Sequence, residues 1–211
     1  MTNKDLTEMV FILDRSGSMS PVIDESIEGF NSMVEKQKLE PGRANVSLAI
    51  FDNEYNLIYD GENINNIDKL NNSTFFARGL TALLDAVGKT INTVGQRLSS
   101  INEEYRPSKV IVAIMTDGLE NSSREFSRDK IKEMVETQTD KFKWEFIFLG
   151  ANMDAIGEGN AIGVKRSFNY SGGVGGQSVA TQGLSDAVAS YRSTGSSALD
   201  ELSQDSFVDN K

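Results

Sequence analysis

Short runs of apolar residues alternate with longer stretches of mixed polarity along the chain. Four runs have strand length and are rich in valine, isoleucine and phenylalanine: residues 9–13, 46–51, 110–115 and 144–149. Nearly continuous apolar runs are typical of strands that are covered on both faces, as in a parallel sheet. The pattern therefore predicts four central strands.

Helical periodicity fills the intervals between these strands. Ser20-Pro21 suits a helix start, with serine as the capping residue and proline at the first helical position. A longer apolar stripe extends from Leu80 to Ile101, and Ser127 is placed to cap a third helix. The apolar stripe after Ser20-Pro21 consists of Ile23, Ile27, Phe30 and Val34.

Strands that alternate with helices predict an α/β fold, with a doubly wound, mostly parallel sheet and helices on both faces. Residues 52–54 form a plausible turn between the strand at 46–51 and a second run at 55–59. Such a hairpin would add one antiparallel edge strand to the sheet. The asparagine-rich segment 62–73 is predicted to be loop.

The pattern changes after residue 149. A weak helix and a short strand at 167–170 precede the glycine-rich segment 171–176, which reads as a flexible linker. Beyond it, Leu184, Val188 and Tyr191 form one modest helical stripe, and a polar tail follows that we expect to be mobile. We therefore expect one domain over residues 1–170 and a linker with a helical, mobile extension over 171–211.

Composition narrows the possible functions. The 211 residues contain no cysteine and no histidine, which excludes disulfides, thiolate-bound zinc and Ser-His-Asp or Cys-His catalysis. The net charge of −10 makes nucleic acid and anionic membranes poor partners. The apolar run at 9–13 is too short for a signal sequence or a membrane span, so we expect a soluble, cytoplasmic protein.

Candidate chemistry gathers where the predicted strands end. Asp14-Arg15-Ser16-Gly17-Ser18 follows the first strand directly, and open α/β sheets bind ligands at the carboxyl ends of their strands. A carboxylate and two hydroxyls spaced two residues apart can converge on one cation, and Gly17 allows a tight turn between them.

Two further segments offer matching groups. Asp117-Gly118 follows the strand at 110–115, and Thr81 opens the long helix. Two carboxylates and three hydroxyls are hard oxygen ligands, which suit Mg²⁺, with Mn²⁺ or Ca²⁺ as alternatives. Each residue alone has a plainer explanation: Thr81 as a helix cap and Asp117 as a turn residue. Asp52 and Asp154 also follow strands and are better explained as turn or cap residues.

At these residues the chain closely resembles the von Willebrand factor A family. Its metal-ion-dependent adhesion site combines an Asp-x-Ser-x-Ser loop with a distant threonine and a distant Asp-Gly, in this order. The resemblance covers residues 6–168, and Gly150-Ala151-Asn152 also looks like bacterial and phage members. It implies that Ser16, Ser18 and Thr81 bind the metal directly, whereas Asp14 and Asp117 act mainly through water.

The implied function is metal-dependent protein binding without catalysis. An open coordination position on the metal would accept an aspartate or glutamate from a partner protein. Four residues flank the ligands and are candidates for a partner-binding rim, with ordinary surface loop as the alternative: Arg15, Met19, Glu120 and Asn121.

Two other functions remain open at this stage. A metal-dependent phosphohydrolase would use the same cation, but it needs cationic phosphate clamps, for which only Arg15, Arg78 and Arg124 are nearby. A structural protein with an empty site would show no stabilisation by metal.

Overall fold

A six-stranded sheet forms the centre of the computed structural model, which describes residues 2–173 and 175–208. The strand order is β3-β2-β1-β4-β5-β6, and every neighbouring pair is parallel except β2 and β3. The predicted fold class, including the antiparallel edge strand, is confirmed. The strands are β1 (Asn3–Asp14), β2 (Arg43–Phe51), β3 (Tyr55–Asn63), β4 (Pro107–Thr116), β5 (Glu145–Ala151) and β6 (Arg166–Tyr170).

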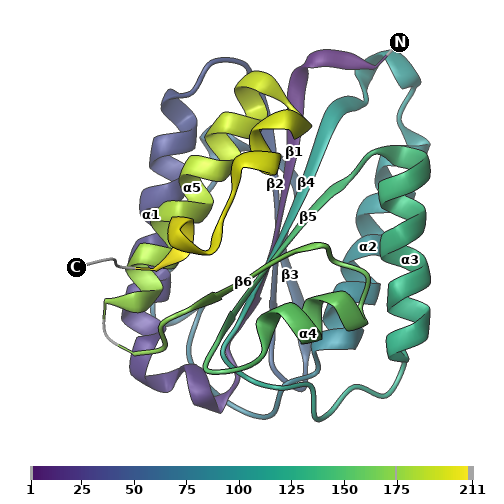
Figure 1. Ribbon diagram of the computed structural model, residues 1–211. Coiled ribbons are helices and arrows are strands. Elements are labelled where there is room, and N and C mark those ends of the chain that lie inside the picture. The colour runs from purple at the N-terminus through teal and green to yellow at the C-terminus, as the bar shows by residue number, and fades with distance from the viewer. Residues whose placement is uncertain (1, 174, 209–211) are drawn as a thin grey trace.

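Helices cover both faces of the sheet (Figure 1). α1 (Ile23–Leu39) and α5 (Gly176–Thr194) lie together on one face, and α2 (Leu83–Ser100), α3 (Arg128–Phe142) and α4 (Ala155–Ala161) lie on the other. Among residues 2–173 and 175–208, no helix has the length and apolar character needed to cross a membrane. Short 3₁₀ helices span Gly17–Val22, Ile64–Asn66, Glu103–Tyr105, Ser196–Glu201 and Gln204–Phe207.

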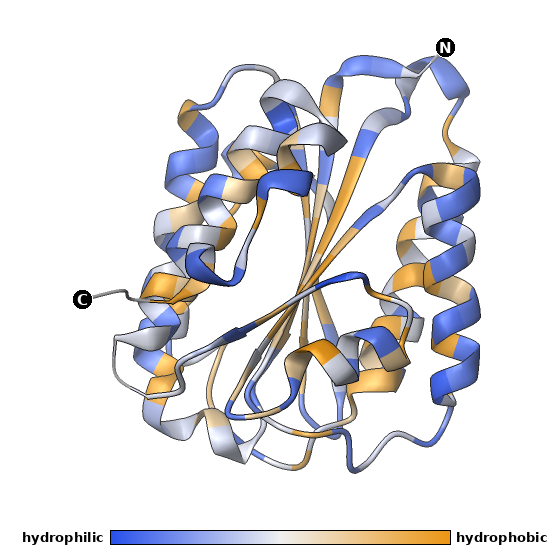
Figure 2. Ribbon diagram, in the orientation of Figure 1, coloured by the Kyte–Doolittle hydropathy of each residue, from blue (hydrophilic) through white to orange (hydrophobic). Residues whose placement is uncertain are grey.

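Alternation along the strands produces two separate cores. In β1, Met9, Phe11 and Leu13 pack toward α1 and α5, whereas Val10 and Ile12 pack toward α2 and α3. Successive side chains of a strand point to opposite faces, so a strand buried on both sides must be apolar throughout. Figure 2 shows the result, with hydrophobic strands at the centre and hydrophilic outer faces on α1 and α3.

Two helix starts differ from the sequence prediction. Ser20 and Pro21 lie inside a 3₁₀ helix, and α1 begins at Ile23 without a side-chain cap. The tight 3₁₀ turn carries Met19 and Val22 into the core, so the burial of these two side chains determines the local structure here. The long helix starts at Leu83 rather than at residue 80. Ser127 does cap α3, since its hydroxyl accepts a hydrogen bond from the Lys130 N–H.

The C-terminal segment also differs from the prediction. A mobile tail was expected, but residues 176–207 complete the core on the α1 side, where Leu199 and Phe207 are buried with the helical stripe of α5. α5 packs closely on α1: a β-carbon built on Gly29 would lie 2.8 Å from the Thr181 hydroxyl. This segment contains glycines and many polar residues, so the few apolar residues that anchor it form no clear pattern in the sequence.

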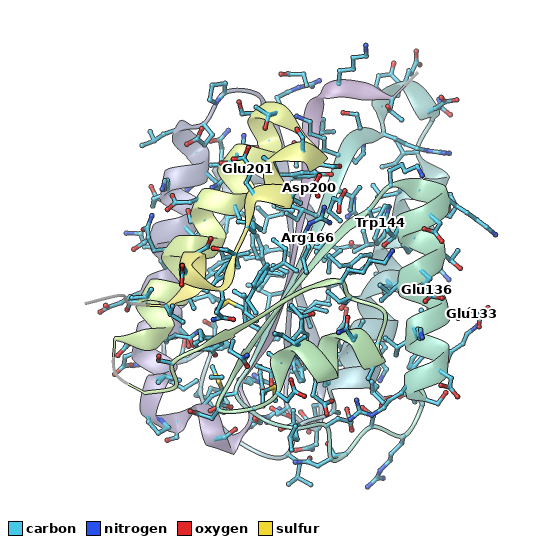
Figure 3. The ribbon with its side chains drawn as sticks, in the orientation of Figure 1. Glu133, Glu136, Trp144, Arg166, Asp200 and Glu201 are labelled. Atoms are coloured by element: carbon cyan, nitrogen blue, oxygen red, sulfur yellow. The ribbon has the colours of Figure 1, made fainter. Side chains whose placement is uncertain are left out.

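Ion pairs at the edge of the sheet hold the same segment. Arg166 of β6 lies between β5 and the segment that follows α5 (Figure 3). Its guanidinium donates to Glu145 at 2.6 Å and to Asp200 at 2.6 Å, and its Nε donates to the carbonyl of Leu199 at 3.2 Å. The chain after residue 194 is therefore attached to the sheet by polar as well as apolar contacts.

Candidate metal centre

The predicted ligands meet at the carboxyl ends of β1 and β4, at the lower edge of the sheet in Figure 1. These strands pair directly, with Leu13 opposite Met115, so Asp14 and Thr116 end up side by side. Thr81 joins them from the loop that leads into α2. The topology thus brings together three segments that are far apart in the sequence.

Asp14 is fully buried and accepts two short hydrogen bonds. Its Oδ1 accepts from the Ser16 N–H at 2.6 Å, and its Oδ2 accepts from the Thr116 hydroxyl at 2.5 Å. Burial raises the pKa of this carboxyl to about 6, although these hydrogen bonds oppose the rise. The nearby charge of Asp117 raises the pKa further.

Asp117 lies across the site and is linked to the serine loop. The Ser18 hydroxyl donates to Asp117 Oδ1 at 2.5 Å, and the hydroxyl oxygens of Ser16 and Ser18 are 3.1 Å apart. Desolvation also raises the pKa of Asp117 above its ordinary value, and the hydrogen bond from Ser18 opposes this rise. Both carboxylates are therefore costly to keep ionised in the absence of a cation.

Gly118 shows how closely the three hydroxyls converge. A β-carbon built on this glycine would lie 2.9 Å from Thr81 Oγ1, 3.3 Å from Ser18 Oγ and 3.6 Å from Ser16 Oγ. The three oxygens thus surround one small space, which only a residue without a side chain leaves open. This arrangement, beside two carboxylates, fits a small cation with hard oxygen ligands.

Asn121 positions Thr81 through a reciprocal pair of backbone contacts. The Thr81 N–H donates to Asn121 Oδ1 at 2.9 Å, and the Asn121 N–H donates to the Thr81 carbonyl at 3.0 Å. Thr81 itself is not the cap of α2, because Ala82 occupies that position and no side chain caps it. The carboxylate of Glu120 instead accepts from the Leu84 N–H in the first turn, at 2.9 Å.

Two of the predicted rim residues are in fact buried. Arg15 is 3% exposed and Met19 is 1% exposed, so neither reaches a partner in this structure. The guanidinium of Arg15 turns inward to Asp52, and Met19 joins the core. Leu80 and Leu119 lie next to Thr81 and Gly118 in sequence and are 56% and 55% exposed, which makes them better rim candidates.

Asp52 ends the neighbouring strand β2 and is a structural residue. Its Oδ2 accepts from Arg15 Nε at 2.9 Å and from Arg78 Nε at 2.7 Å, and its Oδ1 accepts from the Glu54 N–H at 2.6 Å. Asp154 is also structural, since it caps α4 by accepting from the Gly157 N–H. Both agree with the turn and cap roles expected from the sequence.

Sequence reasoning missed the residues that support the ligands. Thr116 and Asn121 each hold one ligand in place, yet neither belongs to the motif, and Asn121 was considered only as a rim residue. The position of Thr116 directly before Asp117, at the end of a buried strand, was the available signal. Within residues 2–173 and 175–208, no cluster of three or more carboxylates suits a metal, so the hydroxyls are essential to any such site.

Comparisons with known proteins agree with this architecture. Residues 8–170 match the family model described as von Willebrand factor type A domain, whereas no curated protein matches the chain. One similar solved structure is proximal thread matrix protein 1 from the mussel byssus with a zinc-occupied MIDAS motif. It has a TM-score of 0.59 and 13% identity, over 90% of this chain and 47% of that one.

A second similar structure is a von Willebrand factor type A protein from Catenulispora acidiphila. It has a TM-score of 0.55 and 14% identity, over 90% of this chain and 43% of that one. The chain therefore spans about half the length of either protein, and at these identities the likeness concerns the fold alone. The family match covers most of the chain, from β1 to the end of β6, and the chain belongs to the von Willebrand factor type A domain family.

Proposed function

We propose that this protein is a cytoplasmic, divalent-metal-dependent protein-binding module of the type found in bacteria and phages. In this proposal Ser16, Ser18 and Thr81 hold Mg²⁺ directly, and Asp14 and Asp117 hold its water molecules. Bound there, the cation would supply a Lewis-acidic position for a carboxylate from a partner protein.

One observation carries the proposal: buried Asp14 and half-buried Asp117 lie close enough together that the charge of Asp117 adds to burial in raising the pKa of Asp14. Among the described residues, no lysine or arginine forms an ion pair with Asp14 or Asp117. A buried carboxylate is costly unless it is paired or coordinates a metal. A divalent cation would neutralise both charges at once, and the space beside Gly118 lies within reach of all three hydroxyls.

The comparisons add support from the fold. The mussel byssus protein carries zinc in a MIDAS motif, and this chain has residues that resemble that motif at the carboxyl ends of β1 and β4. Zinc is the ion in that structure. We favour Mg²⁺ here because the ligands are hydroxyls and carboxylates, with no histidine or cysteine in the sequence.

The surface around the site supports binding of a protein. Leu80 and Leu119 expose large apolar side chains directly beside the ligands Thr81 and Asp117-Gly118. Exposed apolar side chains next to polar groups are typical of protein interfaces. The chain is strongly acidic, so an acidic residue of a partner needs the metal to approach this edge of the sheet.

The alternative of a phosphohydrolase has weaker support. Phosphoryl transfer needs cationic groups directed at the phosphate. Of the three arginines considered, Arg15 and Arg78 both direct their Nε groups to Asp52, away from the candidate metal. Two of the three candidate phosphate clamps are therefore committed to Asp52, which favours binding over turnover.

Calorimetric titration with Mg²⁺ and Mn²⁺ tests the metal site. We expect binding to the wild type, and loss of binding in Asp14→Asn and in Gly118→Ala. The second variant keeps all five ligands but fills the space between the hydroxyls. Gly95→Ala is the matched control, because a β-carbon there meets nothing closer than 3.9 Å. Equal affinity in wild type and Gly118→Ala would refute the site.

Affinity capture from the host then tests partner binding. The wild type should retain a partner in Mg²⁺ and release it in EDTA, whereas Gly118→Ala should retain nothing in either condition. A partner that stays bound in EDTA, or that Gly118→Ala binds equally well, would show that binding does not use the metal.

A further inference from the structure

A second pocket opens directly beside the candidate metal centre. It has a volume of about 270 Å³, and its polar walls are Ser18, Asp117, Asn152, Tyr170 and Gln177. Ser18 and Asp117 belong to the metal centre, so the pocket and the metal share a wall. The remaining residues come from the ends of β5 and β6 and from the first turn of α5. The pocket has the size of a single side chain rather than of a large ligand.

Two buried polar atoms in this pocket have no hydrogen-bond partner. They are the hydroxyl of Tyr170 and the Oε1 of Gln177, whose residues are 4% and 3% exposed. An unsatisfied buried polar group costs on the order of 1–3 kcal/mol, and such groups are rare in folded proteins. Two of them in one pocket, next to a candidate binding site, point to a ligand that would satisfy both.

Several neighbouring polar groups do have partners within the chain. The Gly175 N–H donates to the carboxylate of Glu25 at 2.9 Å, and the Thr181 hydroxyl donates to the backbone carbonyl of Gln177 at 2.8 Å. The other tyrosine of this core, Tyr191, donates its hydroxyl to the carbonyl of Val110 at 3.2 Å. Tyr170 and Gln177 both line the pocket, whereas a further unpartnered atom of α5, Arg192 Nε, lies near the other end of the helix.

The chemistry of the two free atoms defines what would fit. Gln177 Oε1 accepts a hydrogen bond and so needs a donor, whereas the Tyr170 hydroxyl can donate and so needs an acceptor. A primary amide carries a hydrogen-bond donor, its NH₂ group, and an acceptor, its oxygen, on the same carbon. If the Gln177 side-chain amide rotates by 180°, its nitrogen takes the place of its oxygen and donates a hydrogen bond instead of accepting one. A primary amide ligand can pair with it in either orientation. A carboxylate has no hydrogen to donate, so it could not satisfy the Gln177 oxygen.

We propose that this pocket is a second subsite of the partner-binding surface, which takes an asparagine or glutamine side chain adjacent to the acidic residue that reaches the metal. This rests on the proposed function, since the acidic residue brings the amide to the pocket. Tyr170 and Gln177 thus select among acidic segments by hydrogen bonding, while the metal provides the common anchor.

A displayed library of short peptides with a fixed central aspartate tests the proposal. The full-length protein selects peptides in Mg²⁺, and a parallel selection contains EDTA. We expect asparagine or glutamine to be enriched at one position beside the aspartate, only in Mg²⁺. In Tyr170→Phe and Gln177→Met this enrichment should disappear, while Mg²⁺-dependent binding of aspartate-containing peptides persists. Tyr191→Phe is the matched control and should select as the wild type does.

Synthetic peptides with asparagine or leucine at the selected position then give the size of the effect. We expect the wild type to prefer the asparagine peptide by about fivefold or more, and each pocket variant to lose that preference. Metal-dependent selection without an amide preference, or with another residue preferred, overturns the subsite but leaves the proposed function intact. No metal-dependent selection for acidic peptides at all overturns both.

Discussion

Asp14 and Asp52 lie at the ends of neighbouring strands and are both completely buried, yet their hydrogen-bond and ion-pair partners differ. Asp52 receives two arginines and a backbone N–H. Asp14 receives hydroxyls and a backbone N–H but no arginine, and burial raises its pKa to about 6. The structural aspartate is neutralised by two arginines, whereas Asp14 has no basic partner among the described residues, as expected for a carboxylate of the proposed metal site.

The difference shows how one sheet edge can hold two acidic residues with separate roles. Arg15 lies between Asp14 and Ser16 in sequence, but its side chain points to Asp52. The basic side chain that lies between the candidate ligands in sequence is therefore paired with Asp52 and not with Asp14. Four measurements test this contrast, and they are given in order of decreasing effect.

Asp52→Asn should produce the largest change in stability. The substitution leaves Arg15 buried without its anionic partner, and breaking a buried ion pair in this way costs about 3–5 kcal/mol. Urea unfolding in EDTA measures the loss. Asp5→Asn, which breaks the exposed pair with Arg43, is the control and should leave stability unchanged. A small effect of Asp52→Asn would mean that the two aspartates do not differ as described.

Added Mg²⁺ should stabilise the wild type by about 3 kcal/mol when its concentration is about 100 times Kd. Asp14→Asn should show no such gain, because the neutral amide cannot hold the metal's water in the same way. Thermal unfolding with and without Mg²⁺ measures both. Since the metal favours the ionised carboxylate, the gain in the wild type should be full at pH 8 and should shrink below about pH 6. A gain that is independent of pH would contradict the role of Asp14.

Without metal, Asp14→Asn should instead raise stability at pH 8, by up to about 3 kcal/mol. The pKa of Asp14 is raised in the folded state from 3.8 to about 6, so the folded protein binds this proton more tightly than the unfolded chain does. Ionised Asp14 therefore destabilises the fold above pH 6, and this penalty disappears as the pH falls toward 4. The advantage of the variant should vanish over the same range. Urea unfolding in EDTA at several pH values tests the sign, and a variant less stable at pH 8 would refute it.

The smallest expected effect concerns two buried tyrosines, of which one has a hydrogen-bond partner and the other has none. Tyr191→Phe removes a hydrogen bond to the Val110 carbonyl and should cost about 1 kcal/mol. Tyr170→Phe removes a hydroxyl that has no partner, so it should cost nothing or stabilise the protein slightly. Equal losses in the two variants would show that the Tyr170 hydroxyl is already satisfied in the free protein.

The mostly parallel sheet and the meeting of the candidate ligands at one edge were predictable for a common physical reason. Continuous apolar runs predict buried parallel strands, and the ends of such strands must meet at one edge. Side-chain direction was not predictable: Arg15 and Met19 follow the first strand as Ser16 and Ser18 do, yet both turn inward. Whether a loop residue faces solvent depends on contacts with distant segments, here Asp52 and the core beneath α1.

The C-terminal segment was hard to predict because its signal is sparse. Two isolated apolar residues, Leu199 and Phe207, anchor a stretch that is otherwise polar. Periodicity needs several residues to be detected, whereas burial of one large side chain is enough to fix a short 3₁₀ turn. The support of the candidate metal site by Thr116 and Asn121 was missed for a similar reason, since each acts through one or two hydrogen bonds.

The packing of α5 has a practical consequence for work on relatives of this protein. The family match ends at residue 170, but Ala180, Leu184 and Val188 of α5 cover apolar residues of β1, β2 and β4. A protein truncated at the end of the match would expose that face to water and would be prone to self-association. The segment recognisable by sequence is thus shorter than the unit that folds, and expression trials should extend at least to Phe207.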